Sequence, residues 1–273
     1  MAPMKNVYLN IVVQTPRSLA TRERVGAFCD VLRTIDPDLV PHKFGPAEPL
    51  RSIFDLGKAE EQIADLHRLN GGSMIFAFKP PLDGLMHFNT ARGRRVPSNG
   101  LKVQINYAAL VSRLDDIQAL IKLMFGSLGA AYACATLSGG SPHIVHVDDP
   151  KKNWGKINGV EVPPWNPTGL QCLPGICWIN VFGSEYVRFI GEDVLASLPA
   201  QPLSDGSGFW LQPTKRPEEM LTHSGRALAD DIKSRIGKPL AFCGHDPSTP
   251  SFRATYDTPP FDFSEIRPSS QPA

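Results

Sequence analysis

Two stretches of the chain, residues 5–44 and 101–137, show the same succession of hydropathy patterns. Each begins with alternating apolar and polar residues, which is typical of a half-buried strand. Each continues with apolar residues three and four positions apart, which indicates an amphipathic helix, and ends in a second strand-like run. Because the apolar stripe of such a helix must be buried against another element, this succession predicts helices packed on a β-sheet. The repeat is one of architecture only, since the two stretches share negligible sequence identity.

The first stretch opens with the alternating segment Lys5–Gln14 and continues with a helix predicted over residues 17–35. The second opens with Leu101–Tyr107, after which Ser112 and Asp115 are spaced as in a helix-capping box. The apolar stripe of its helix comprises Leu114, Ile117, Ile121, Met124 and Leu128. Further strands are predicted over residues 39–44, 73–78, 85–89, 130–137, 176–182 and 208–212, and further helices over 57–69, 184–198 and 217–236.

These elements predict an α+β fold with two lobes, each a mixed β-sheet with helices packed on it. The length of 273 residues corresponds to roughly two domains at about 150 residues each. The segment Arg92–Gly100 is polar and rich in turn residues, so we place a boundary near residue 96. The expected domains are residues 1–96 and 97–264. The composition of residues 265–273 predicts a flexible tail.

Charge and hydropathy argue against two broad classes of function. Lysine and arginine total 28 and aspartate and glutamate total 27, so the chain lacks the basic excess that is usual in nucleic-acid-binding proteins. No run approaches 18 apolar residues, and the first ten residues lack the features of a signal peptide. Most of the five cysteines lie in apolar segments, where we expect buried, reduced thiols. We therefore expect a cytoplasmic protein without membrane or nucleic-acid partners.

The segment Ser138–Gly175 differs from the rest of the chain because it is rich in proline and glycine. Only Ile144–Val147 within it has a regular pattern. Loops of this length are uncommon and tend to be functional or disordered, and the tryptophans Trp154 and Trp165 argue against plain disorder. The two rings either anchor the loop against the protein or contact a partner.

No segment has the spacing of a known catalytic or metal-binding motif. The chain contains neither a G-x-S-x-G nucleophile elbow nor an H-E-x-x-H pair. His143 and His146 would point to opposite faces of a strand, and the pairs Asp148–Asp149 and His245–Asp246 complete the set of candidate ligands. We expect no cofactor and no metal. A hydrolase or metal-dependent nuclease that uses these histidines and aspartates remains the alternative.

The segment Cys177–Gly191, which reads CWINVFGSEYVRFIG, resembles the bacterial immunity proteins of type VI secretion systems. The shared pattern is an apolar strand that leads into a helix containing Tyr186 and Val187. His42–Gly45, followed by a proline and a leucine, and the strand Gly208–Gln212 are also similar to the family. The similarity extends from about residue 5 to about residue 243, but the long proline-rich segment does not align with the family.

The resemblance implies a protein with no reaction of its own, which binds and neutralises a toxin delivered by neighbouring cells or made by the same cell. We predict that Asp148, Asp149, Trp154 and Trp165 contact this toxin. The two carboxylates would mimic an anionic substrate in the toxin's active site, and the tryptophans would supply desolvated anchor area. In the alternative arrangement the loop folds back on the protein and nearby lysines neutralise the two acids.

Overall fold

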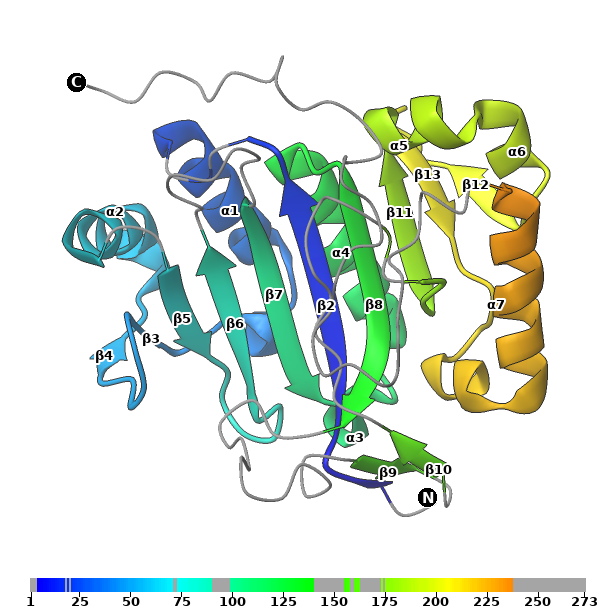
Figure 1. Cartoon of the computed structure of the whole chain (residues 1–273). Coiled ribbons are helices and arrows are strands. Elements are labelled where there is room, and N and C mark those ends of the chain that lie inside the picture. The colour runs from blue at the N-terminus through cyan, green and yellow to red at the C-terminus, as the bar shows by residue number, and fades with distance from the viewer. Residues whose placement is uncertain are drawn as a thin grey trace.

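The structure is a computed structural model, and it describes residues 4–17, 19, 21–70, 73–89, 99–139, 155–157, 160–162, 173 and 175–237. A large β-sheet runs through the molecule, with helices behind its central strands and at both of its ends (Figure 1). Ten described strands form this sheet in the order β12-β13-β11-β8-β2-β7-β6-β5-β3-β4. Their bounds in that order are Ala200–Pro202, Gly208–Leu211, Ile179–Gly183, Tyr132–Gly139, Val7–Thr15, Asn99–Asn106, Gly84–Asn89, Ser73–Ala77, Lys43–Gly45 and Ser52–Ile53.

The expected α+β class is confirmed, but the two expected lobes of mixed sheet are one antiparallel sheet. The strand β7 begins just after residue 96 and lies between β2 and β6, which both precede that residue. It pairs antiparallel with β2 from Tyr8 opposite Asn106 to Thr15 opposite Asn99, and antiparallel with β6. An alternating pattern identifies a strand and its two faces, but it does not specify the neighbour or its direction. The sequence pattern therefore could not exclude a shared sheet.

The two strand–helix–strand units are present, and their helices pack on the same face of the sheet (Figure 1). The first unit consists of β2, α1 and β3, and the second of β7, α4 and β8. Because β2 pairs with both β7 and β8, the second unit spans β2 rather than joining adjacent strands. The helices of the described residues are α1 Arg22–Thr34, α2 Ala59–Asn70, α3 Tyr107–Leu110, α4 Leu114–Leu128, α5 Ser184–Ile190, α6 Glu192–Ala196 and α7 His223–Ile236, with short 3-10 turns η1 Pro37–Leu39, η2 Leu56–Lys58 and η4 Pro217–Leu221.

Three helices begin at other residues than the sequence predicts. The N-cap of α1 is Thr21, whose side chain accepts a hydrogen bond from the backbone N–H of Arg24. The capping box expected at Ser112 is wrong, because the N-cap of α4 is Arg113 and makes no side-chain cap bond. The helix expected over residues 217–236 is divided, because Thr222 caps a new helix after η4.

A second, smaller sheet contains part of the proline-rich segment. The strands β9 Gly155–Ile157 and β10 Val160–Val162 form an antiparallel pair, and β9 also pairs with β1 Met4–Lys5. These strands are regular structure that the sequence pattern did not predict. The one regular stretch expected there, Ile144–Val147, lies outside the described residues.

The main core lies between the sheet and the helices α1 and α4. The stripe predicted for α4 is confirmed, since Ile117, Ile121, Met124 and Leu128 are buried and Leu114 packs against the same core. The cysteines that the structure describes are also as expected: Cys29, Cys134 and Cys177 are free and buried. Burial raises the pKa of Cys29 to about 11 and keeps this thiol protonated. Within the described part of the chain, no helix has the length and apolar character needed to span a membrane.

Replacing either of two glycines with alanine should change the free energy of unfolding, and the two changes should have opposite signs. Gly26 lies inside α1, where an added Cβ would meet nothing within 4 Å. Gly26→Ala should therefore raise the free energy of unfolding by about 1 kcal/mol through helix propensity. Gly191 separates α5 from α6 with a φ of 104°, which L side chains rarely adopt. Gly191→Ala should therefore lower the free energy of unfolding by about 1 to 2 kcal/mol. Urea unfolding measures both changes in free energy, and two changes of the same sign would contradict the backbone conformations of Gly26 and Gly191.

Candidate functional site

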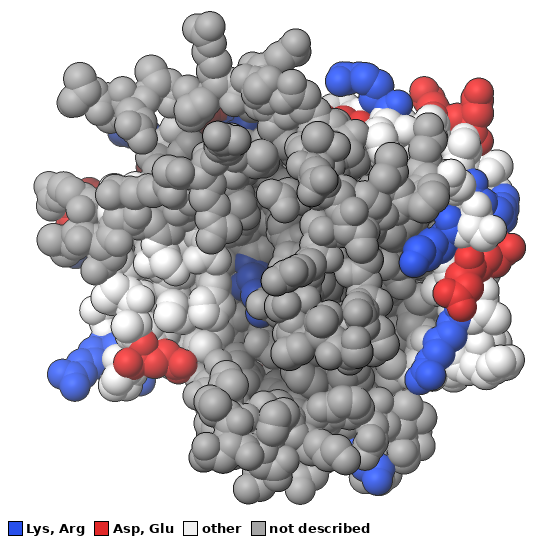
Figure 2. All heavy atoms as spheres, in the orientation of Figure 1, with Lys and Arg blue, Asp and Glu red and all other residues white. Residues whose placement is uncertain are grey.

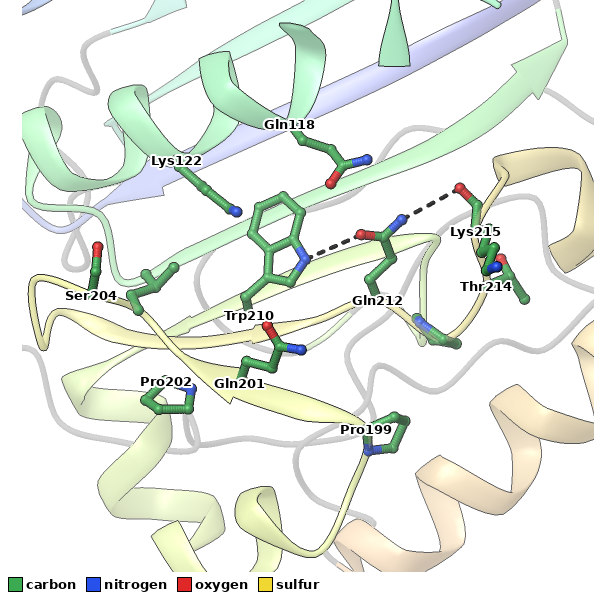
Figure 3. Close-up of a pocket in the computed structure, with 12 residues that line it drawn as sticks. Gln118, Lys122, Pro199, Gln201, Pro202, Ser204, Trp210, Gln212, Thr214 and Lys215 are labelled. Atoms are coloured by element: carbon green, nitrogen blue, oxygen red, sulfur yellow. Dashed lines mark hydrogen bonds between the residues drawn. The ribbon is translucent and has the colours of Figure 1, made fainter. Parts of the chain in front are cut away.

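A groove lies between α4 and the hairpin formed by β12 and β13 (Figure 3). Its volume is about 510 Å³. We call it the Trp210 groove and define it by six of its lining residues, which are Gln118, Lys122, Gln201, Pro202, Trp210 and Lys215. Pockets of this size are large enough for a small ligand or for a few side chains of a partner.

The hairpin beside the groove is closely fitted to the sheet. Gln201 of β12 pairs with Trp210 of β13, and the backbone N–H of Leu203 donates to the carbonyl of Gly208 at 2.8 Å. A Cβ at Gly208 would lie 2.0 Å from the carbonyl oxygen of Phe182, so only glycine allows β13 to approach β11 this closely. This contact places Trp210 against α4 at the base of the groove.

Trp210 contacts one charged and one polar side chain of the groove. The ammonium nitrogen of Lys122 lies 4.7 Å from the centre of its ring, within the range of a cation–π interaction (Figure 3). The indole N–H donates to Oε1 of Gln212 at 3.3 Å, and Nε2 of Gln212 donates to the carbonyl of Lys215 at 3.4 Å. The residue is only 6% exposed, so its ring forms the floor of the groove and does not protrude.

The wall that carries Lys215 is tied to the buried core by a chain of hydrogen bonds. The indole N–H of Trp178, which is fully buried, donates to the carbonyl of Thr214 at 3.1 Å. Nε of Arg216 donates to Glu218 at 2.6 Å, and the Tyr107 hydroxyl donates to the other oxygen of that carboxylate. Burial and this hydrogen bond raise the pKa of Tyr107, so the phenol stays protonated as a donor. A wall fixed in this way needs little ordering when something binds.

The groove is positively charged. Lys122 and Lys215 are both exposed, and no aspartate or glutamate is found among the described residues that line it. Asp205 lies at one end, near Gly126 of α4, but it accepts hydrogen bonds from the backbone N–H and the hydroxyl of Ser207 at 3.0 and 2.7 Å. These bonds lower the pKa of Asp205 and hold its carboxylate within its own turn.

One side of the molecule carries charges of both signs. On the face shown in Figure 2, lysine and arginine side chains alternate with aspartate and glutamate side chains along the side formed by α5, α6 and α7. Neighbouring charges of opposite sign largely cancel at a distance, particularly at physiological ionic strength. The Trp210 groove differs from this side, because the charged residues of its described lining are both lysines.

The residues that the sequence singled out as partner contacts, Asp148, Asp149, Trp154 and Trp165, lie outside the described residues. Their role therefore stays a prediction. The candidate metal ligands His143, His146, His245 and Asp246 also lie outside them. Within the ranges that the structure covers, no group of three or more histidine, cysteine, aspartate or glutamate side chains is placed to hold a metal ion.

Sequence reasoning missed the Trp210 groove. It predicted the strand at residues 208–212 but assigned no partner to Trp210. The available signal was the pair Gln118 and Lys122, which are four residues apart and therefore share one face of α4. Nothing in the local sequence indicates that this face meets β13.

Comparison with known proteins supports the fold. No protein-family model matches the chain, and no curated protein matches it significantly. The fold is similar to a solved structure, the Pseudomonas aeruginosa T6SS protein PA0821, with a TM-score of 0.57. The match covers 86% of this chain and 77% of that chain at 14% sequence identity. At this identity the likeness establishes a common fold.

Proposed function

We propose that this protein is an immunity protein of a type VI secretion system, which neutralises a toxin by binding it in the cytoplasm. The observation that carries the proposal is the fold shared with a T6SS protein over 86% of the chain. The sequence pattern of Cys177–Gly191 supports it by a separate route, because it resembles immunity proteins of the same secretion system. A fold match at 14% identity owes little to residue similarity, so the two arguments are largely independent.

The place of the family-like segment in the fold fits a protein that acts by binding. Cys177–Gly191 forms β11 and α5, and its side chains Trp178, Phe182 and Tyr186 are fully buried. The segment is thus a packing unit, and through Trp178 it supports one wall of the Trp210 groove. In this proposal the chain has no reaction of its own. It protects the cell by binding to the toxin, and such binding requires a rigid, well-defined surface.

Competition between bacteria tests the proposal. A strain that lacks this gene should be killed by its parent when the two grow in contact, because the parent delivers a toxin that the mutant cannot neutralise. Survival should return when a plasmid supplies the chain, or when the parent lacks a working secretion apparatus. The measurement is the ratio of surviving mutant to parent after co-culture. Equal survival of the mutant with and without the plasmid would contradict the proposal.

The same experiment identifies the partner. Among attackers that each lack one toxin gene, only the attacker without the matching toxin should spare the mutant strain. The purified chain should then form a stoichiometric complex with that toxin. A metal-dependent hydrolytic activity of the purified chain that is lost in His143→Ala would instead support the enzyme alternative.

A further inference from the structure

We infer that the Trp210 groove receives an acidic segment of the toxin. This inference rests on the proposed function, because it names the surface through which neutralisation occurs. Its first basis is charge: two exposed lysines, Lys122 and Lys215, border a cavity whose described lining contains no carboxylate. Two cations without a carboxylate in the described lining favour an anionic partner and speed its association.

The side chain of Lys122 and the backbone of Lys215 are also held in position. Lys122 stacks on the ring of Trp210, and the backbone of Lys215 is bonded to Gln212. The hydrogen bond from Trp178 to Thr214 fixes the adjoining backbone to the core. Because the charge of Lys122 and the backbone that carries Lys215 are positioned before binding, an acidic partner would lose less affinity to the ordering of this wall.

The shape and lining of the groove suit a short protein segment. Trp210 and prolines such as Pro202 give it an apolar floor and side, while Gln118 and Gln201 place amide groups at its border. Protein interfaces combine apolar and polar contacts, and this lining offers both. A volume of about 510 Å³ accommodates a few side chains rather than a whole domain. A nucleic-acid partner is disfavoured, because the net charge of the chain is only +1.

A binding experiment with a labelled oligo-glutamate peptide tests the charge preference directly. The parent protein should bind it more tightly than an oligo-lysine peptide of equal length. Lys122→Glu/Lys215→Glu should weaken binding about tenfold, because it removes two attractive contacts and adds two repulsive ones. The conservative variant Lys122→Arg/Lys215→Arg should retain binding, since both charges remain.

A matched control separates the groove from overall charge. Lys43 of β3 and Lys58 of η2 are also exposed, and they lie toward the opposite end of the sheet from β12. Lys43→Glu/Lys58→Glu changes the net charge by the same amount and should bind the peptide like the parent. The inference is overturned if the control weakens binding equally, if the parent does not bind the peptide, or if oligo-thymidylate binds as tightly.

The same variants in the co-culture assay distinguish the two proposals. Lys122→Glu/Lys215→Glu should remain folded, as shown by a cooperative urea transition, but should no longer restore survival. The control variant should restore it fully. If the parent chain itself gives no protection, the proposed function fails. If the parent and the groove variant protect equally, only the inference about the groove fails.

Discussion

Replacing Trp178 with alanine is expected to lower the free energy of unfolding by about 4 kcal/mol, near the upper end of the range for large-to-small core substitutions. The side chain is fully buried within the main core, so its removal leaves a cavity. It also removes the hydrogen bond to the carbonyl of Thr214, which then has to find another partner. Urea denaturation followed by circular dichroism measures the change without relying on tryptophan fluorescence.

The variant Trp178→Phe separates packing from hydrogen bonding. It keeps an aromatic ring but lacks the indole N–H, so it should lower the free energy of unfolding by about 2 kcal/mol. It should also weaken oligo-glutamate binding, because Thr214 is released from the core near Lys215. If Trp178→Ala costs less than about 1 kcal/mol, the ring does not anchor this wall.

Periodicity in the sequence was sufficient for most elements of the sheet. The alternation over Leu101–Tyr107 predicted β7, and the structure buries every second residue of that strand. Strand order was not predictable, because pairing depends on contacts between residues far apart in the chain. The position of β7 between β2 and β6 is the clearest example, since it merges the two expected lobes into one sheet.

The candidate site was harder to predict than the fold for the same physical reason. Gln118 and Lys122 lie on α4, whereas Trp210 and Lys215 lie on and after β13. Only the tertiary packing of α4 against the β12–β13 hairpin brings these residues together. Trp178 is buried in the strand predicted over residues 176–182, but its hydrogen bond to Thr214 depends on the path of the chain after β13.

Two buried asparagines should respond in opposite ways to the same substitution. Asn180 is fully buried, and its amide is satisfied: Oδ1 accepts from the backbone N–H of Cys177 and from the hydroxyl of Tyr132, and Nδ2 donates to the carbonyl of Cys177. Asn180→Leu leaves these buried groups without their partner. It should therefore lower the free energy of unfolding by about 3 kcal/mol.

Asn10 of β2 is equally buried, but neither Nδ2 nor Oδ1 has a hydrogen-bond partner among the described residues. A buried amide without partners destabilises the folded state, because its groups were hydrated in the unfolded chain. Asn10→Leu removes that penalty and should raise the free energy of unfolding by about 1 to 2 kcal/mol. Both substitutions add the same volume, so the difference between them isolates the hydrogen bonds. If Asn10→Leu destabilises the protein as much as Asn180→Leu, the amide of Asn10 is satisfied in solution, and a bound water or ligand at this position of β2 becomes the explanation to pursue.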